Sequence, residues 1–201
     1  MKTLSQQKVW SNLAQEWYKF KDKPSHNVIN FLKNKSGKIL DLGSGAGRHL
    51  VKTKGKLYLV DFSEEMIKFA KKKAKKEKIN AEFFVSDITK KKLPFENNFF
   101  DYCVAIAVFH CITKDKHKQS VKELYRVMKP KSEALIAVWN KDSKRFKNAG
   151  KEKYVSWRDK GKRYYYLFDE KEIYDLFKKA GFKIKEKLES DVNIVFVAEK
   201  L

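Results

Sequence analysis

The chain has 201 residues, which is enough for one domain with an apolar core and too few for two. Lys and Arg total 46 against 25 acidic residues, so the formal net charge is +21 and a polyanion such as nucleic acid is the expected partner. With 42% hydrophobic residues, the composition excludes a disordered chain. No apolar run of transmembrane length and no signal peptide is present, which predicts a cytoplasmic protein without a membrane partner. Cys103 and Cys111 are too few for a disulfide framework or a zinc site, so buried thiols and no metal are expected.

Helical spacing dominates the start of the chain, and short apolar strands dominate the region after it. Trp10, Leu13 and Trp17 lie three or four residues apart, which predicts an N-terminal helical cap over residues 1–36. A core follows over residues 37–139. Its expected strands are 38–42, 57–60, 81–85, 99–107 and 134–139, and its expected helices are 64–78 and 116–127.

The rest of the chain divides into a polar insertion and a closing unit. The basic stretch 140–162 has little periodicity and is expected to belong to an inserted acceptor-side loop, residues 140–168. Residues 169–201 are expected to close the domain with a helix at 170–178 and strands at 182–187 and 193–199.

The order of these elements predicts one α/β domain, residues 1–201. Strands that alternate with helices imply right-handed crossovers and a mostly parallel sheet, here of seven strands with helices on both faces. The last two strands are joined too tightly for a crossover helix, so the last strand is expected to be antiparallel.

The first strand runs into glycines at alternate positions, Gly43, Gly45 and Gly47. Such a loop lets the backbone turn sharply and lets a ligand approach closely, and a helix with free N–H groups is expected to begin after it. The third glycine comes one residue too early for the dinucleotide-binding fingerprint. Asp61 ends the second strand, where an acid in such folds binds both ribose hydroxyls, and Asp87 after the third strand is placed to accept from an adenine amino group. Alternatively, both acids are helix caps or turn residues.

The run from Lys38 to Trp139, with its D-L-G-x-G-x-G loop and its strand-end acids, resembles the core of the class I methyltransferases. The resemblance implies a Rossmann-like fold and S-adenosylmethionine as the cofactor. It implies that the methionine moiety of the cofactor contacts Gly43, Gly45 and Gly47, and that its amino group is held by Asp41, directly or through water. The ribose would contact Asp61, and the adenine would contact Asp87 and Ile88. It also implies that Ile106 or Ala105 lines the methyl end.

Three further motifs resemble the Trm9/ALKBH8-type tRNA wobble-uridine methyltransferases. They are A-I-A-V-F-H-C at residues 105–111, R-Y-Y-Y-L-F at 163–168, and W-Y-K-F-K at 17–21 followed by Pro24. That family esterifies a carboxymethyl group on a wobble uridine, forming 5-methoxycarbonylmethyluridine, so tRNA is the implied substrate. The family commonly has His where this chain has Cys111 and Tyr166. The resemblance also implies a small zinc-binding activator of the Trm112 type, which would extend the sheet along residues 82–85.

The implied acceptor needs orientation more than it needs a strong base, because a carboxylate is already ionised at neutral pH. Arg163 is expected to hold the carboxylate or a neighbouring phosphate through its guanidinium fork. His110 is expected to bind the base or the acceptor oxygen, and Tyr164 and Tyr165 are expected to stack on the uracil. The predicted catalytic residues are therefore His110, Arg163 and Tyr164, and the predicted substrate contacts are Lys21, Trp139 and Tyr165.

Each of these assignments has an alternative. His110 is alternatively a core-edge histidine bonded to the backbone, the tyrosines cover the sheet, and Trp139 packs in the core. The segment 140–162, which carries Arg145, Trp157 and Arg158, is the expected tRNA contact. Two other functions stay open on these observations: a small-molecule methyltransferase on the same core, and an RNA-binding protein without catalysis.

Overall fold

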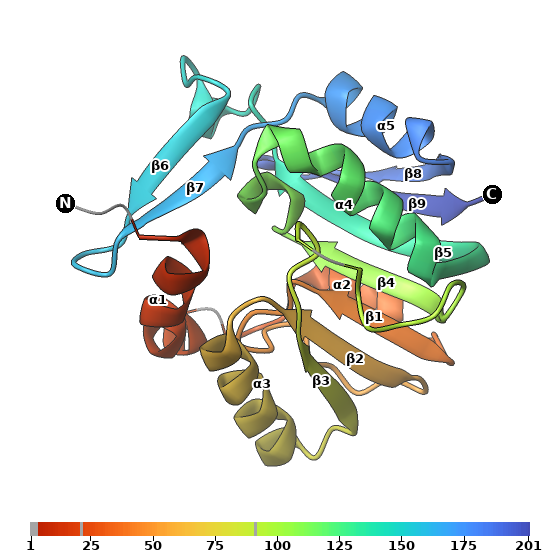
Figure 1. Ribbon diagram of the computed structural model, residues 1–201. Helices are drawn as coiled ribbons and strands as arrows, with labels where there is room; N and C mark the ends of the chain where they lie inside the picture. The colour runs from red at the N-terminus through yellow and green to blue at the C-terminus, as the bar shows by residue number, and fades with distance from the viewer. Residues whose placement is uncertain (1–3, 21, 91) are drawn as a thin grey trace.

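The computed structural model describes residues 4–20, 22–90 and 92–201, whose arrangement is shown in Figure 1. Seven strands form one sheet in the order β3–β2–β1–β4–β5–β9–β8. The strands are β1 (Lys38–Leu42), β2 (Lys56–Asp61), β3 (Ala81–Val85), β4 (Phe100–Ile106), β5 (Met128–Trp139), β8 (Phe182–Leu188) and β9 (Asn193–Lys200). Neighbours from β3 to β5 pair in parallel, whereas β9 runs antiparallel to both β5 and β8. The predicted mostly parallel seven-stranded sheet with an antiparallel last strand is confirmed.

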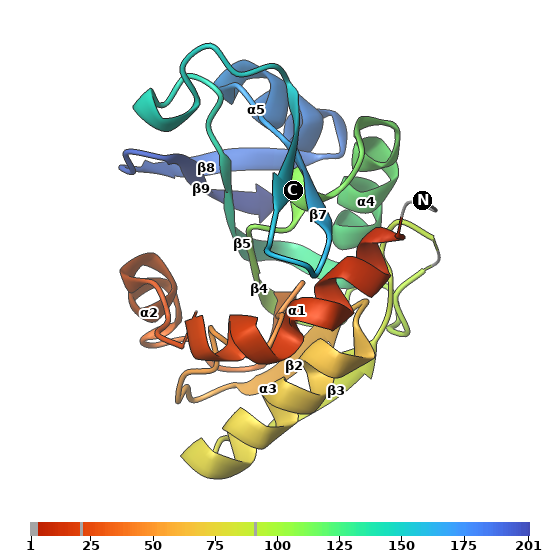
Figure 2. The ribbon, with the colours of Figure 1, turned by 90° about the vertical axis from the view of Figure 1, so that its left-hand side faces the viewer.

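Helices cover both faces of this sheet. They are α1 (Gln6–Phe20), α2 (His26–Leu32), α3 (Glu64–Glu77), α4 (Lys114–Val127) and α5 (Glu170–Lys179), with 3-10 turns η1 (Phe109–Cys111) and η2 (Lys144–Phe146). Figure 2 shows α2 on one side of the sheet and α4 on the other. Val28 of α2 and Ala70 of α3 pack with Ile39 of β1, while Leu124 of α4 and Phe177 of α5 belong to the opposite apolar layer. The central strands are therefore buried on both faces, as parallel strands usually are.

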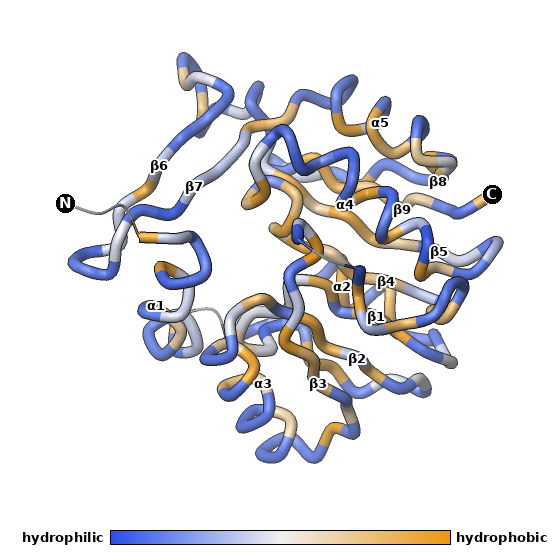
Figure 3. The backbone as a smooth tube through the Cα atoms, viewed as in Figure 1, coloured by the Kyte–Doolittle hydropathy of each residue, from blue (hydrophilic) through white to orange (hydrophobic). Residues whose placement is uncertain are grey.

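The outer surface is polar. Figure 3 shows hydrophilic residues over the outer turns of the helices and apolar residues along the central strands. No helix in the described part of the chain is long and apolar enough to cross a membrane. The same residues contain no group of His, Cys, Asp and Glu side chains suited to a metal ion.

The connection between β1 and β2, residues 43–55, consists of turns and irregular backbone. The predicted helix after the glycine loop is therefore wrong. Gly43, Gly45 and Gly47 have positive φ angles of 64°, 53° and 80°, and a Cβ atom on Gly47 would lie 3.1 Å from the Cα atom of Ala70. The loop thus passes tightly against α3, and α2 covers the face on which a crossover helix would otherwise pack. The glycines serve a close turn rather than a helix start.

The segment 140–168, expected to be a loop, contains an antiparallel hairpin of β6 (Glu152–Ser156) and β7 (Lys162–Tyr166). Tyr164 and Tyr166 of β7 belong to the main core. Arg163 and Tyr165 lie on the other side of the strand, against rings of α1 and η1. Because both sides of β7 are buried, the sequence lacks the polar–apolar alternation that indicates a half-buried strand.

The N-terminal helix α1 packs between α3 and β7. Its buried side chains contact the glycine loop and α3 through Val9, Leu13 and Ala14 against Ala46 and Met66. The side-chain amide of Gln6 donates to the Lys162 carbonyl oxygen at 3.1 Å, and its own carbonyl oxygen accepts from the Tyr164 N–H at 2.8 Å. This part of the predicted helical cap therefore covers the glycine loop and is bonded to β7.

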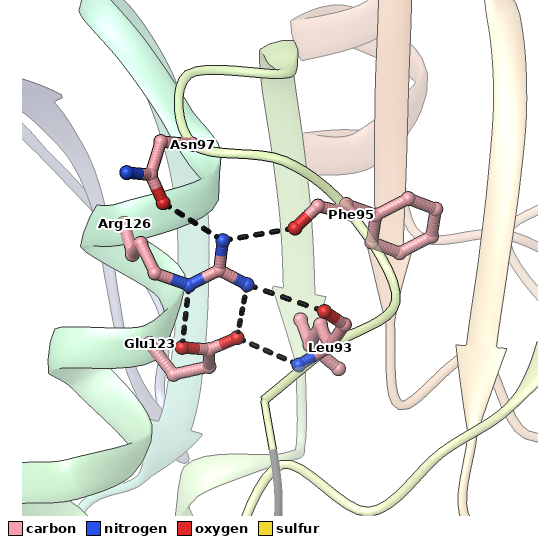
Figure 4. A network of polar contacts seen from close by, with 5 residues as sticks. All are labelled: Leu93, Phe95, Asn97, Glu123 and Arg126. Carbon is pink, nitrogen blue, oxygen red and sulfur yellow. Dashed lines mark hydrogen bonds and ion pairs between the residues drawn. The ribbon is translucent and has the colours of Figure 1, made fainter.

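One charged pair fixes the connection between β3 and β4 to α4, as Figure 4 shows. Glu123 and Arg126 form an ion pair with Nη2 and Oε1 2.6 Å apart. Arg126 also donates to the carbonyl oxygens of Leu93 and Phe95 and to Asn97 Oδ1, while Glu123 Oε1 accepts from the Leu93 N–H at 2.7 Å. The pair thus provides hydrogen-bond partners for backbone groups of this irregular connection and attaches it to α4.

We expect Glu123→Ala to lower the free energy of unfolding by about 2–4 kcal/mol, because it leaves a half-buried guanidinium and a buried N–H without their acceptor. Urea denaturation measures the change. Lys122→Ala, at an exposed neighbouring position of α4, is the matched control and should change stability by less than about 0.5 kcal/mol. Equal stability of the two variants would contradict the role given to the pair.

Candidate active site

Asp41, in β1, carries a buried carboxylate whose bonding is incomplete. The residue is 2% exposed, and its Oδ2 atom has no hydrogen-bond partner among the described residues. Burial and, to a lesser extent, the charge of Asp61 raise the pKa of Asp41 to about 8. A buried carboxyl oxygen without a donor is costly. The position therefore suits a cationic donor from a ligand.

Asp61 ends β2 and fixes the glycine loop to it. Its Oδ2 atom accepts from the Gly45 N–H and its Oδ1 atom from the Ser63 N–H, both at 2.9 Å. Burial raises the pKa of Asp61 to about 6, although these two bonds act in the opposite direction. Each carboxylate oxygen has a second lone pair, so Asp61 retains capacity to accept from ligand hydroxyls.

Asp87 follows β3 and forms a turn with Thr89. Its Oδ1 atom accepts from the Thr89 N–H at 2.9 Å and from the Thr89 hydroxyl at 2.6 Å, and Lys90 Nζ lies 3.3 Å from Oδ2. This geometry agrees with the alternative that Asp87 is a turn residue. The neighbouring Ile88 is buried. An adenine contact by this pair stays a prediction.

Two serine hydroxyls add to the unfilled bonding capacity near the acids. The Ser44 N–H donates to the Val60 carbonyl oxygen and the Ser86 N–H to that of Asp61, so both serines lie at the carboxyl end of β2. Their Oγ atoms are buried, and no partner for them exists within residues 4–20, 22–90 and 92–201. Buried polar groups are normally bonded. Together with Asp41, these serines give the strand ends a set of groups that a polar ligand would satisfy.

Trp17 connects the glycine loop to a cluster of aromatic rings. A Cβ atom on Gly45 would lie 3.8 Å from Trp17 Nε1. The Trp17 ring lies 5.2 Å from that of Trp10 and 5.7 Å from that of Trp157. Glu16 accepts from Trp157 Nε1 at 2.7 Å. Helix α1 and the tip of the β6–β7 hairpin therefore meet beside the loop.

Arg163 lies inside this aromatic cluster. The residue is 6% exposed, its Nη1 donates to the Tyr165 hydroxyl at 2.7 Å, and its Nε has no hydrogen-bond partner in the described chain. Its guanidinium carbon lies 5.7, 5.5, 4.9 and 5.4 Å from the ring centres of Trp10, Trp17, Trp157 and Tyr165. The nearby carboxylate of Glu16 pairs with Arg158 instead. A buried cation that meets four rings and one hydroxyl, but no carboxylate among the described residues, suits an anionic ligand.

Arg163 lies near the glycine loop and Asp61. Trp17 lies beside Gly45 and also contacts the Arg163 guanidinium. The thiol of Cys111 also connects the two charges. Burial raises the pKa of this thiol, the charge of Asp61 raises it further, and the charge of Arg163 lowers it. The thiol is thus within electrostatic reach of both charges.

His110 has the geometry of its backbone-bonded alternative. The residue is 1% exposed, and its Nδ1 atom accepts from the Trp139 N–H at 2.9 Å. Burial lowers the pKa of His110 to about 3. The imidazole is therefore neutral with its proton on Nε2. In this state it can donate through Nε2 but cannot serve as a base near neutral pH.

Tyr164 and Tyr165 point to opposite sides of β7, as neighbours in a strand do. The Tyr165 ring lies 4.1 Å from that of Trp139 and 5.5 Å from that of His110, so these three residues gather beside Arg163. Tyr164 packs in the main core. The expectation that both tyrosines stack on one base is therefore not met, and the geometry separates Tyr164 from the other predicted site residues.

Two predicted positions need separate mention. Ile106 ends β4 and is partly buried, and the exposed Ala107 after it has a φ angle of 63°. Such an angle is uncommon for a residue with a Cβ atom and marks a backbone held by its surroundings. The methyl-end role of Ile106 stays a prediction. Lys21 lies outside the described residues.

In the sequence, Trp10 and Trp17 are evidence of helical spacing, and neither ring is predicted as part of the site. Their spacing of seven residues places both rings on one face of α1, which is a usable signal for a shared contact. Trp157 adds a third indole ring to this aromatic cluster from the distant β6–β7 hairpin, and no local sequence pattern links it to α1. Its inclusion in the site depends on the fold alone.

Comparison with known proteins finds relatives among the methyltransferases. Residues 39–131 match the family described as methyltransferase domain. The tRNA (carboxymethyluridine(34)-5-O)-methyltransferase of Arabidopsis thaliana is 34% identical over 103 residues, which cover 50% of this chain and 24% of that protein. The ubiquinone/menaquinone biosynthesis C-methyltransferase UbiE of Wigglesworthia glossinidia brevipalpis is 30% identical over 114 residues, covering 54% of this chain and 45% of that protein. The chain thus spans less than half the length of either relative.

Solved structures share the fold. The complex between the Haloferax volcanii Trm112 methyltransferase activator and a methyltransferase matches with a TM-score of 0.74 and 16% identity, covering 98% of this chain and 99% of that chain. A SAM-dependent methyltransferase from Aquifex aeolicus matches with a TM-score of 0.69 and 23% identity, covering 99% and 100%. Residues 39–131, which hold the glycine loop, are thus similar to a methyltransferase domain, and the chain shares its fold with solved SAM-dependent methyltransferases.

Proposed function

We propose that this protein transfers a methyl group from S-adenosylmethionine to the carboxylate of a carboxymethyluridine at the wobble position of tRNA. The observation that carries the proposal is Arg163, a buried guanidinium near the glycine loop that has no acidic partner among the described residues. An acceptor carboxylate would supply the missing charge through a bidentate pair. The net charge of +21 and the similarity to the Arabidopsis enzyme support tRNA as the carrier of that carboxylate.

The cofactor half of the site uses the strand-end acids and the glycine loop. Asp41 Oδ2 accepts from the cofactor's amino group, and Asp61 accepts from its ribose hydroxyls. The methionine moiety contacts Gly43, Gly45 and Gly47, and the adenine contacts Asp87 and Ile88. Ile106 lies at the methyl end. The unpartnered buried groups of Asp41, Ser44 and Ser86 support this fit, because a polar ligand would complete their bonding.

The acceptor half orients a group that is already nucleophilic. When bound, S-adenosylmethionine supplies a methyl group on a positively charged sulfur. The acceptor carboxylate is ionised at neutral pH, so no residue has to remove a proton. Arg163 holds the carboxylate, Tyr165 and Trp139 flank the base, and His110 donates its Nε2–H as a neutral ring. Fixing the two reactants in line contributes up to about 7–11 kcal/mol in well-aligned systems.

The test uses two anticodon stem-loop RNAs that differ only at the wobble uridine, one carboxymethylated and one unmodified. We expect methyl transfer to the first alone, detected as a methyl-sized mass increase on that nucleoside. Equal transfer to both RNAs would remove the substrate assignment. Methylation of a small aromatic acceptor with none of RNA would favour the chemistry named for the UbiE relatives.

The outer edge of the sheet supports a second part of the proposal, an activator subunit of the Trm112 type that adds to β3. β3 is the outermost strand, and Val85 at its end is 47% exposed. An apolar open edge is normally covered or blunted. The similarity in fold to the methyltransferase solved with the Haloferax volcanii Trm112 activator supports this kind of partner.

We expect Val85→Asp to abolish co-purification with a Trm112-type subunit from the chain's own source, because it places a charge on the proposed apolar contact. Size-exclusion chromatography of the co-expressed proteins measures the complex. Ile29→Asp, an exposed apolar position on α2, is the matched control and should leave the complex intact. A complex that forms equally well with Val85→Asp would rule out this docking edge.

A further inference from the structure

A second arginine, Arg145, is connected to the buried Arg163 through two aromatic rings. Arg163 donates to the Tyr165 hydroxyl, the Tyr165 ring lies 4.1 Å from that of Trp139, and the Arg145 guanidinium carbon lies 5.0 Å from the Trp139 ring centre. Arg145 is exposed, in contrast to Arg163. The rings of Tyr165 and Trp139 therefore connect an inner and an outer cation.

The turn η2 holds Arg145 in this position. The Ser143 hydroxyl donates to the Asn140 carbonyl oxygen at 2.8 Å, and the Phe146 N–H donates to the Ser143 carbonyl oxygen at 3.0 Å. Phe146 is buried with its ring 4.9 Å from that of Trp139, and the Arg145 guanidinium also lies 5.3 Å from the Phe146 ring centre. Stacking on two rings restricts the long side chain before any ligand binds, which reduces the entropy cost of binding.

Arg145 has no acidic partner within the described chain. No carboxylate there lies within ion-pair distance of it, and the exposed Lys144 and Lys147 beside it add charge of the same sign. The pKa of Tyr165, which burial raises, is lowered by both Arg163 and Arg145, so the outer guanidinium acts electrostatically on the acceptor side of the site. An exposed planar cation of this kind matches two phosphate oxygens.

We infer that Arg145 binds a backbone phosphate of the acceptor RNA, next to the nucleoside whose carboxylate Arg163 holds. The inference rests on the proposed function and narrows it. A nucleotide within RNA carries phosphates beside its base, whereas a free nucleoside or small acid does not. Arg145 thus makes the site select an acceptor embedded in a polynucleotide.

The test compares Arg145→Gln with the unchanged protein on two acceptors, a carboxymethyluridine anticodon stem-loop and the carboxymethyluridine nucleoside. For the stem-loop we expect KM to rise about tenfold with kcat within twofold, and the plot of log affinity against log salt to become shallower by about one unit. The nucleoside, which lacks a phosphate, should react equally with both proteins. Arg145→Lys should restore the salt slope but only part of the KM, because it lacks the planar fork.

Lys183→Gln is the matched control, since it removes an exposed positive charge from β8 near Glu199 and Glu133, at the end of the sheet away from the strand ends that form the site. It should leave the stem-loop KM unchanged. Fluorescence anisotropy with the labelled stem-loop repeats the comparison without turnover. If the unchanged protein methylates the stem-loop while Arg145→Gln keeps its KM and its salt slope, the inference fails and the proposed function stands. If the unchanged protein methylates neither acceptor, the proposed function fails, and the anisotropy comparison still decides whether Arg145 contacts RNA phosphate.

Discussion

Replacing Asp41 by Asn is expected to weaken the binding of S-adenosylhomocysteine about a hundredfold and to stabilise the chain without ligand. The Oδ2 atom of Asp41 is buried without a partner in the described part of the chain and is the proposed acceptor for the ligand's amino group. Losing a buried charge pair of this kind typically costs about 2–5 kcal/mol. The same carboxylate destabilises the fold when no cation faces it, because burial and the charge of Asp61 both oppose its ionisation. Isothermal calorimetry measures the first effect and thermal denaturation the second.

The pH dependence of the two effects has opposite sign. Because the pKa of Asp41 is raised from 3.8 to about 8, the folded chain without ligand holds a proton that the unfolded chain has lost. This group's contribution to the free energy of unfolding therefore falls as pH rises from about 4 to about 8. Binding of a cationic amino group favours the ionised carboxylate, so ligand affinity rises over the same interval with release of a proton. Asp41→Asn should flatten both profiles, and identical profiles for the two proteins would contradict the assignment.

Replacing Arg163 by Gln is expected to reduce kcat/KM for the carboxymethyluridine acceptor by about 10²- to 10³-fold and to leave S-adenosylhomocysteine binding within about threefold. The guanidinium is the proposed holder of the carboxylate, and removal of one partner of a buried charge pair costs several kcal/mol. Arg163→Lys keeps the charge but loses the planar fork, so it should recover only part of the rate. Steady-state kinetics and calorimetry separate the two halves of the site.

Folding of the Arg163 variants provides a further check. A buried cation without a carboxylate partner among the described residues contributes little net stability, so Arg163→Met should unfold at a temperature equal to or above that of the unchanged chain. Arg158→Gln, on the exposed part of the same hairpin, is the matched control and should leave cofactor binding and turnover of the free carboxymethyluridine nucleoside unchanged. If Arg163→Gln lost cofactor binding and acceptor turnover to the same extent, Arg163 would have a general structural role instead of the proposed one.

The sequence was sufficient for the sheet because its central strands are apolar runs that end in glycines or acids. The predicted strand 38–42 coincides with β1, and Asp61 ends β2 as expected. The positions of Asp41 and Asp61 follow from these strand bounds alone. The mostly parallel pairing of the strands followed from their alternation with helices and the crossover rule, whereas their order in the sheet came from the structure.

The acceptor side could not be predicted in the same way, because its contacts are tertiary. Trp10 and Trp17 come from α1 and Trp157 from the hairpin, and they meet only around Arg163. The sequence marked Arg163 by its motif but gave no sign of its burial among rings. Side chains in a strand alternate between its two faces, so Tyr164 points away from the site while Tyr165 points toward it. The three consecutive tyrosines of β7 gave no polar–apolar alternation that would have shown this.

The missing helix after the glycine loop has a similar cause. Glycines followed by a basic stretch are typical of a helix start in this family's core, and the local sequence offers no contrary signal. The face on which such a helix would pack is occupied by α2, whose Val28 and Leu32 are buried there. The short chain between Gly47 and β2 and the packing of α2 on this face both disfavour a helix there.

The chemical bond that the methyl group forms provides the most direct test of the central claim. The protein is incubated with the carboxymethylated stem-loop RNA and methyl-labelled S-adenosylmethionine, and the recovered RNA is treated with mild alkali. A methyl ester hydrolyses under these conditions, so we expect the label to leave the RNA as methanol. Label that stays on the base or the ribose after alkali would show that the acceptor is not the carboxylate that Arg163 is proposed to hold.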